Sequence, residues 1–110
     1  MTQNICDEDI EKALDFLRDN AESAAKARAE RIYLEEYRKS LKAILMKEHS
    51  GESGIIQERN AYSDVRYIGH LNAIKNAVYE DEKCRFLRGA AEAMIDAWRS
   101  QSANYRAMKI

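Results

Sequence analysis

Six basic residues and one tyrosine flank the strongest turn signal of the sequence. The signal is HSGESG at residues 49–54, where serines and glycines favour a change of chain direction. The flanking residues are Arg38, Lys39, Lys42, Lys47, Arg59, Tyr62 and Arg66. Clustered lysines and arginines neutralise phosphates without reading base sequence, and an aromatic ring can stack on an unpaired base. The cluster therefore suggests a contact with single-stranded DNA.

Acidic residues in the same region leave a plainer interpretation open. The acids are Glu36, Glu48, Glu52, Glu58 and Asp64. They dilute the positive charge, so on charge alone an ordinary mixed-charge surface is slightly favoured. The basic C-terminal residues also have two interpretations; they are Arg99, Arg106 and Lys109. They form a second phosphate contact or, more economically, complement the helix dipole and an acidic N-terminal helix running alongside.

Catalytic and metal-binding motifs are not indicated. His49 and His70 lie in unrelated contexts, and Cys6 and Cys84 add no ligand spacing. The serines and glycines of the turn lack the preceding strand and the following Lys-Ser/Thr of a phosphate loop. We therefore predict a protein that is not an enzyme and needs no cofactor and no metal.

Most aromatic residues are expected to pack the core or an oligomer interface. The aromatic residues considered are Tyr33, Tyr37, Tyr62, Tyr67, Tyr79, Phe86, Trp98 and Tyr105. Tyr62 and, less directly, Tyr67 lie near the turn, so these two are kept as candidates for contact with bases.

Apolar residues repeat at helical spacing on both sides of the turn. Before the turn they are Ile10, Leu14, Leu17, Ala21 and Ala24, and then, in a shifted phase, Leu34, Leu41, Ile44 and Leu45. After it they are Tyr67, Leu71, Ile74, Val78, Leu87, Ala91, Met94, Trp98, Tyr105 and Met108. Asp7 is a suitable cap for the first helix, and Ser63 with Asp64 resembles a second cap. The sequence predicts an all-α protein with a helix over about 7–48, a hinge over about 49–55, and a short then a long helix over about 56–108.

Two long helices around one hinge predict an antiparallel, coiled-coil-like hairpin in one domain, residues 1–110. If residue 48 faces about residue 63, Arg28 lies opposite about residue 83 and Arg31 opposite about residue 80. At this level of the hairpin, charged residues interrupt both apolar repeats. Pairing of the arginines with Glu80, Asp81 or Glu82 would fix the register. Equally, the arginine side chains reach solvent from the edge of the seam.

The composition suggests self-association in the cytoplasm. The 110 residues are 45% hydrophobic and 34% charged, with no proline, and many of the apolar residues are alanines. A hairpin of this kind buries little surface per residue, so we expect a homo-oligomer. Two lone cysteines fit a reducing compartment, and neither a leader nor an apolar segment of membrane length is evident. We therefore expect a cytoplasmic protein with no membrane partner.

A family resemblance covers nearly the whole chain from about residue 9. It is carried by AKARAERIYLEEYRKSLKAILMKEHSG and QERNAYSDVRYIGHLNAIKNAVYEDEKCRFLRGAAEAMIDAWRSQSANYRAM. These stretches resemble small uncharacterised helical proteins of tailed phages and prophages, which tend to be encoded among replication and recombination genes.

A more distant resemblance is to the UvsY recombination mediator family. The shared pattern is KAIL at residues 42–45, SG at residues 50–51 and ERNAY at residues 58–62. The family has a second basic residue directly after the alanine, where this sequence has Ile44. The resemblance implies a helical-hairpin oligomer that binds single-stranded DNA and helps to load a recombinase, with Lys42 as a DNA contact.

Two hypotheses of function follow. The first is a phage-type accessory protein of DNA recombination that binds single-stranded DNA and scaffolds a recombinase or annealing protein in the bacterial cytoplasm. The alternative is a protein-interaction module without DNA binding, such as a phage inhibitor of a host defence or repair complex. A structural or assembly component of the virion is a third possibility.

Overall fold

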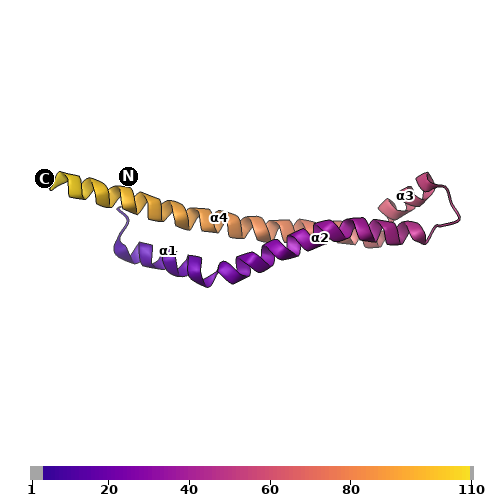
Figure 1. The fold of residues 1–110 in the computed structure, drawn as a ribbon, viewed down its shortest axis with the longest axis horizontal. Helices are drawn as coiled ribbons and strands as arrows, with labels where there is room; N and C mark the ends of the chain where they lie inside the picture. Colours follow the sequence, from indigo (N-terminus) through magenta and orange to yellow (C-terminus); the bar gives the residue numbers. More distant parts are fainter. Residues whose placement is uncertain (1–3, 110) are drawn as a thin grey trace. The chain divides into compact units, whose positions relative to one another are not determined.

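The computed structural model describes residues 4–109, which form four α-helices and no strand (Figure 1). The helices are α1 (Asp7–Asp19), α2 (Ala21–Lys47), α3 (Gly54–Ser63) and α4 (Val65–Met108). The prediction of an all-α protein is confirmed. The turn lies between α2 and α3, and a short helix precedes a long one, as the sequence indicated.

Polar side chains set the starts of three helices. Asp64 caps α4, as predicted, because its carboxylate accepts the Arg66 backbone N–H at 2.8 Å. The Ser53 hydroxyl accepts the Ile56 N–H at 3.4 Å at the start of α3. At α1 the cap is Cys6 rather than the predicted Asp7. The Asp9 carboxylate accepts the Cys6 backbone N–H at 3.1 Å, so Asp7 lies already in the first turn.

Asn20 interrupts the first predicted helix. Its φ of −103° and ψ of 2° depart from helical values. Its backbone N–H and its side-chain amide both donate to the Phe16 carbonyl at 3.0 Å. An asparagine side chain that bonds the nearby backbone competes with helical geometry. The prediction of one helix over about 7–48 is therefore wrong at this residue.

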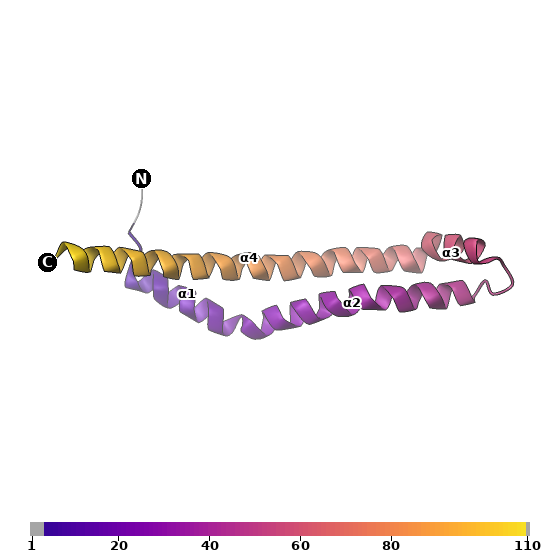
Figure 2. The same cartoon turned by 45° about the horizontal axis from the view of Figure 1, so that its top comes forward.

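The chain divides into two compact units, where the sequence suggested one domain. The first, called here the terminal unit, comprises residues 1–24 and 83–110, of which 4–24 and 83–109 are described. In it α1 runs antiparallel to the second part of α4 (Figures 1 and 2). The Gln101 side chain bonds the backbone N–H and carbonyl of Ile5 at 3.1 and 2.8 Å. The buried apolar side chains are Ile10, Ala13 and Ala91.

The second unit, called here the turn unit, comprises Ala25–Glu82. Here α2 runs antiparallel to the first part of α4, and α3 packs beside them (Figure 2). Its core is Leu45, Ala61 and Tyr67, with Leu41 and Met46 packed against it. Leu45 is 1% exposed, so the unit is tightly packed near the turn.

The predicted register is confirmed inside the turn unit. The Arg31 guanidinium bonds the Asp81 carboxylate across the two helices, and both side chains are largely covered. Arg28 is exposed, so of the two interpretations pairing holds for Arg31 and solvent exposure for Arg28. His70 Nε2 lies 2.7 Å from the Leu34 carbonyl and adds a second link between α2 and α4.

Several residues of the predicted apolar repeats are exposed. Leu14 is 53% exposed, Leu71 40%, Leu87 47% and Met94 40%. Each helix meets its partner along a narrow seam, whereas its apolar residues spread over a wider stripe. Apolar surface therefore remains outside the seams, and the expected self-association stays a prediction.

Candidate nucleic-acid interface

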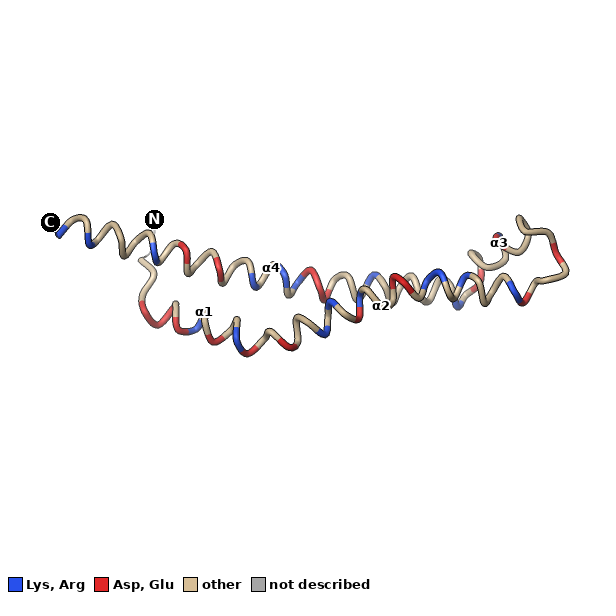
Figure 3. Tube along the Cα trace, viewed as in Figure 1, with Lys and Arg blue, Asp and Glu red and all other residues tan. Residues whose placement is uncertain are grey.

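The predicted DNA-binding residues all lie in the turn unit, on three helices. Arg38, Lys39, Lys42 and Lys47 are on α2, Arg59 and Tyr62 on α3, and Arg66 on α4. Acidic residues precede these four bases of α2 and one follows them past the end of the helix (Figure 3). The site is therefore a mixed-charge region, and each base has to be considered with its neighbours.

Lys42 holds α3 against α2. Its ammonium lies 3.2 Å from the Glu58 carboxylate and 4.6 Å from the centre of the Tyr62 ring. The interaction with Tyr62, followed by the hydrogen bond to Glu58, raises the pKa of Lys42 above its ordinary value. A phosphate would have to displace both partners. The residue carried over from the family resemblance thus has a structural role in this chain.

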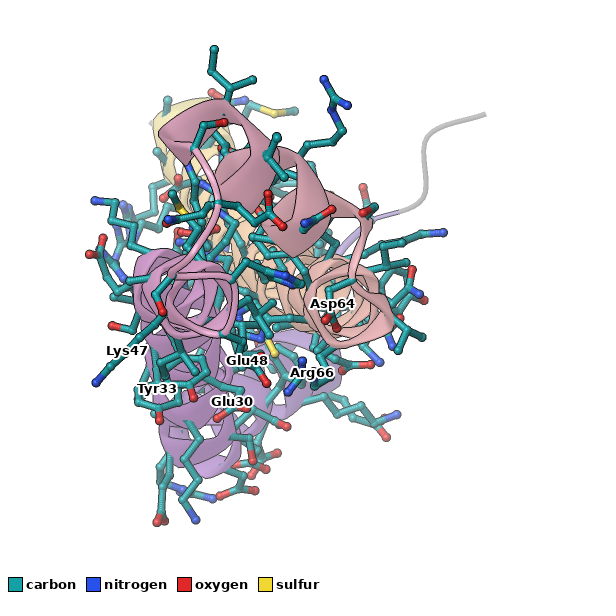
Figure 4. The ribbon with its side chains drawn as sticks, turned by 90° about the vertical axis from the view of Figure 1, so that its right-hand side faces the viewer. Glu30, Tyr33, Lys47, Glu48, Asp64 and Arg66 are labelled. Atoms are coloured by element: carbon teal, nitrogen blue, oxygen red, sulfur yellow. The ribbon has the colours of Figure 1, made fainter. Side chains whose placement is uncertain are left out.

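Arg66 fastens the start of α4 to the end of α2. Its guanidinium bonds Asp64 at 2.9 and 3.0 Å, and Glu48 at 2.7 and 3.3 Å (Figure 4). The Arg66 side chain and its backbone N–H lower the pKa of Asp64 from 3.8 to about 2. Asp64 and Glu48 in turn raise the pKa of Arg66. Two carboxylates already neutralise this arginine.

The remaining four predicted bases are more accessible. Lys39 makes a 3.7 Å pair with Glu36, in which both side chains are more than 70% exposed. Such a pair contributes little and exchanges readily with another anion. Within residues 4–109, Arg38, Lys47 and Arg59 have no carboxylate partner, and all three are exposed. These three are the bases most available for a phosphate.

Tyr62 offers a restricted surface for stacking. It is 44% exposed, but the Lys42 ammonium lies over its ring and Tyr67 packs edge-on at 5.3 Å between ring centres. Tyr67 itself is buried. Both tyrosines near the turn therefore contribute to packing, and an additional base has little room on either ring.

The most exposed aromatic pair of the turn unit was not predicted as a site. The rings of Tyr33 and Tyr37 stack with centres 5.9 Å apart and planes inclined by 16°. Tyr33 is 61% exposed and Tyr37 36%. The four-residue spacing puts the two side chains next to each other on a helix, and this signal was available in the sequence. The predicted role in packing applies to Tyr37, which also contacts His70 at 5.5 Å between ring centres.

Within residues 4–109, the basic C-terminal residues form no ion pair with the acidic helix α1. Arg99 pairs with Asp96 of its own helix at 3.6 Å, and Arg106 is exposed in the last turn of α4, where it complements the helix dipole. In the part of the chain that the structure describes, no three histidine, cysteine or acidic side chains gather as a metal site.

None of the helices within residues 4–109 combines the length and the apolar character that a membrane crossing requires.

The site can thus offer exposed cations and an exposed ring pair to an anionic, aromatic ligand. Comparisons with protein-family models, with characterised proteins and with solved structures found no match to this chain.

Proposed function

We propose that this protein binds single-stranded DNA through its phosphates and acts as a scaffold for a recombinase or annealing protein. It would serve DNA recombination in the bacterial cytoplasm as a phage-type accessory protein. Its mechanism is binding and positioning, without bond chemistry of its own.

The observation that carries the proposal is the set of three unpaired bases in the turn unit. Arg38, Lys47 and Arg59 are exposed and have no carboxylate partner among residues 4–109. Lys39 joins them as a weakly paired base. When exposed cations of a protein bind the phosphates of a nucleic acid, they release the counterions condensed on it. This release drives binding without sequence preference. The fixed Lys42 and Arg66 pairs support the helices that present these bases.

Exposed apolar side chains support the scaffolding part of the proposal. They occur in both units and include Ile32, Ile44 and Ile68 in the turn unit, and Leu14, Leu87 and Met94 in the terminal unit. Apolar surface of this extent is typical of proteins that associate with copies of themselves or with partners. The same surface favours the second candidate function, a protein-interaction module that inhibits a host complex without binding DNA.

Salt dependence tests the proposal and separates the two candidates. Wild-type protein should bind an unstructured oligonucleotide at low salt, with affinity falling by a log–log slope of about −0.7 per phosphate contact. Replacing Arg38 and Lys47 together by Ala should weaken binding and reduce the steepness of that slope by about 1.4, since two contacts are lost. Alanine is an excellent helix former, so the fold should persist, and circular dichroism checks this.

A matched double variant provides the control. Arg99→Ala with Arg106→Ala removes the same charge from the exposed part of the terminal unit and should leave DNA affinity nearly unchanged. Equal losses from the two double variants would show that net charge, rather than a site, governs binding. Absence of binding by the wild type at low salt would refute the proposal and favour the interaction module.

A further inference from the structure

The exposed face of α2 that carries Tyr33 and Tyr37 combines rings and cations at regular spacing. Lys26, Tyr33, Ser40 and Lys47 follow one another at seven-residue intervals, which place them along one side of the helix. Glu30, Tyr37 and Ile44 form the neighbouring row at the same interval. From Tyr33 to Lys47 the face runs for about 21 Å along the helix axis.

The two tyrosines are held in place from behind. The Tyr37 ring contacts His70 of α4, and the Nε2 atom of His70 lies 2.7 Å from the Leu34 carbonyl. A carbonyl oxygen can only accept a hydrogen bond, so Nε2 of His70 is protonated and donates to it. Tyr33 then stacks on Tyr37, with its other face directed to solvent at 61% exposure. The pair is therefore ordered before any ligand binds, which lowers the entropic cost of binding.

Tyr33 lies on the side of α2 away from α3 (Figure 4). Figure 4 shows Tyr33 and Lys47 projecting from this side, with Glu30 nearby. Lys47 is exposed and has no carboxylate partner within residues 4–109. The face thus offers an aromatic platform and an available cation to the same ligand, and α3 does not cover either of them.

We infer that the face formed by Tyr33, Tyr37 and Lys47 is a base-stacking platform for single-stranded nucleic acid. An unpaired base stacks on the open side of Tyr33, and Lys47 binds a phosphate farther along the strand. Stacking of this kind is tolerant of sequence, because each base has a π-face. The inference rests on the proposed DNA binding and replaces Tyr62 by Tyr33 as the ring that receives a base.

Glu30 is an acidic residue close to the stacking ring, and its negative charge disfavours binding of a polyanion. It is exposed one turn before Tyr33 on the same side of α2. The nucleotide whose base stacks on Tyr33 brings its own phosphate near this carboxylate, and like-charge repulsion there weakens binding. Removing the Glu30 charge should therefore improve binding.

Two oligonucleotides of equal length separate stacking from phosphate binding. One is oligothymidylate and the other an abasic strand with the same number of phosphates. Wild-type protein should bind the thymidylate several-fold more tightly at low salt. The double variant Tyr33→Leu/Tyr37→Leu keeps apolar bulk and helix propensity but removes both rings. It should lose on the order of tenfold in affinity for thymidylate, and its affinity for the abasic strand should stay constant.

Three single variants sharpen the test. Lys47→Gln should weaken binding of both strands and flatten the salt dependence by about 0.7. Glu30→Gln should strengthen binding of both. Tyr79→Leu is the matched control, because it removes another tyrosine of the turn unit that is 64% exposed and lies outside this face. It should change neither affinity.

The outcomes distinguish this inference from the function on which it rests. Equal wild-type affinity for the two strands, or a Tyr33/Tyr37 variant that binds thymidylate as the wild type does, overturns the stacking platform and leaves phosphate binding intact. No binding of either strand overturns both. A Tyr33/Tyr37 variant that only changes the mass measured by light scattering assigns the face to a second copy of the chain, and also overturns the inference.

Discussion

The turn unit and the terminal unit use their charged residues in different ways. In the turn unit, ion pairs connect separate segments: Arg31 of α2 with Asp81 of α4, Lys42 of α2 with Glu58 of α3, and Arg66 of α4 with Glu48, which directly follows α2. In the terminal unit, Lys12, Arg18 and Arg99 pair with acids at most four residues away in their own helices. Pairs between helices specify which residues face each other, whereas local pairs only support a helix that is already formed.

This difference indicates where a defined binding surface can be built. A face whose helices are fixed in register presents its side chains at constant spacing, as binding requires. The turn unit meets this condition through its ion pairs and its Leu45 core. The described part of the terminal unit is held together by the Gln101 hydrogen bonds to Ile5 and by the buried side chains of Ile10, Ala13 and Ala91.

The largest expected effect distinguishes a buried leucine of the turn unit from an exposed leucine of the terminal unit. Leu45→Ala removes a side chain that is 1% exposed and should lower the free energy of unfolding by about 2–5 kcal/mol. Leu14→Ala, at a position that is 53% exposed in the terminal unit, should cost at most about 1 kcal/mol. Urea unfolding followed by circular dichroism measures both. Similar costs would show that Leu14 contributes as much packing as Leu45.

A smaller effect concerns the register. Asp81→Asn weakens the pair that joins α2 to α4 and should lower the urea midpoint measurably, because Arg31 loses its principal charged partner. Asp96→Asn makes the same change in the exposed local pair with Arg99 and should leave the midpoint nearly constant. If the two variants unfold at the same urea concentration, the pair between helices contributes no more than a surface pair does.

The smallest effect concerns acid. The pKa of Asp64 in the folded protein is about 2, below its ordinary value of 3.8. The stabilisation by its pairing is therefore complete above about pH 4 and is lost as the pH falls towards 2. Asp64→Asn keeps a capping side chain but removes this titration. Its unfolding free energy should fall less between pH 4 and pH 2 than that of the wild type. A fall of equal size would assign the acid sensitivity to other carboxylates.

Some features could be predicted because they depend on local chemistry or on simple geometry. The Asp64 cap follows from a short polar side chain before an apolar repeat. The pairing of Arg31 with Asp81 follows from folding two helices about one turn and counting back. The use of Lys42 and Arg66 in packing could not be predicted, since it depends on where α3 and the start of α4 place Glu58, Tyr62, Asp64 and Glu48.

The set of candidate DNA-binding residues also differs between sequence and structure, because it depends on contacts between helices. The sequence alone does not show which bases pair with acids that are distant in the chain. The predicted DNA-binding residues therefore include paired bases, such as Lys42 and Arg66, together with unpaired ones. The sequence predicts that Tyr33 and Tyr37 pack the core or an oligomer interface, whereas in the structure Tyr33 is 61% exposed and Tyr37 36%. The seam covers only one side of α2, and this narrowness exposes the pair.

The interruption at Asn20 has a consequence for how the molecule opens. It divides the backbone hydrogen bonds of residues 7–47 into two runs, and the first run, α1, is supported by only two buried side chains, Ile10 and Ala13. Short segments with few buried contacts unfold locally, long before the whole molecule does. The amide protons of α1 should therefore exchange with solvent deuterium much sooner than those near Leu45.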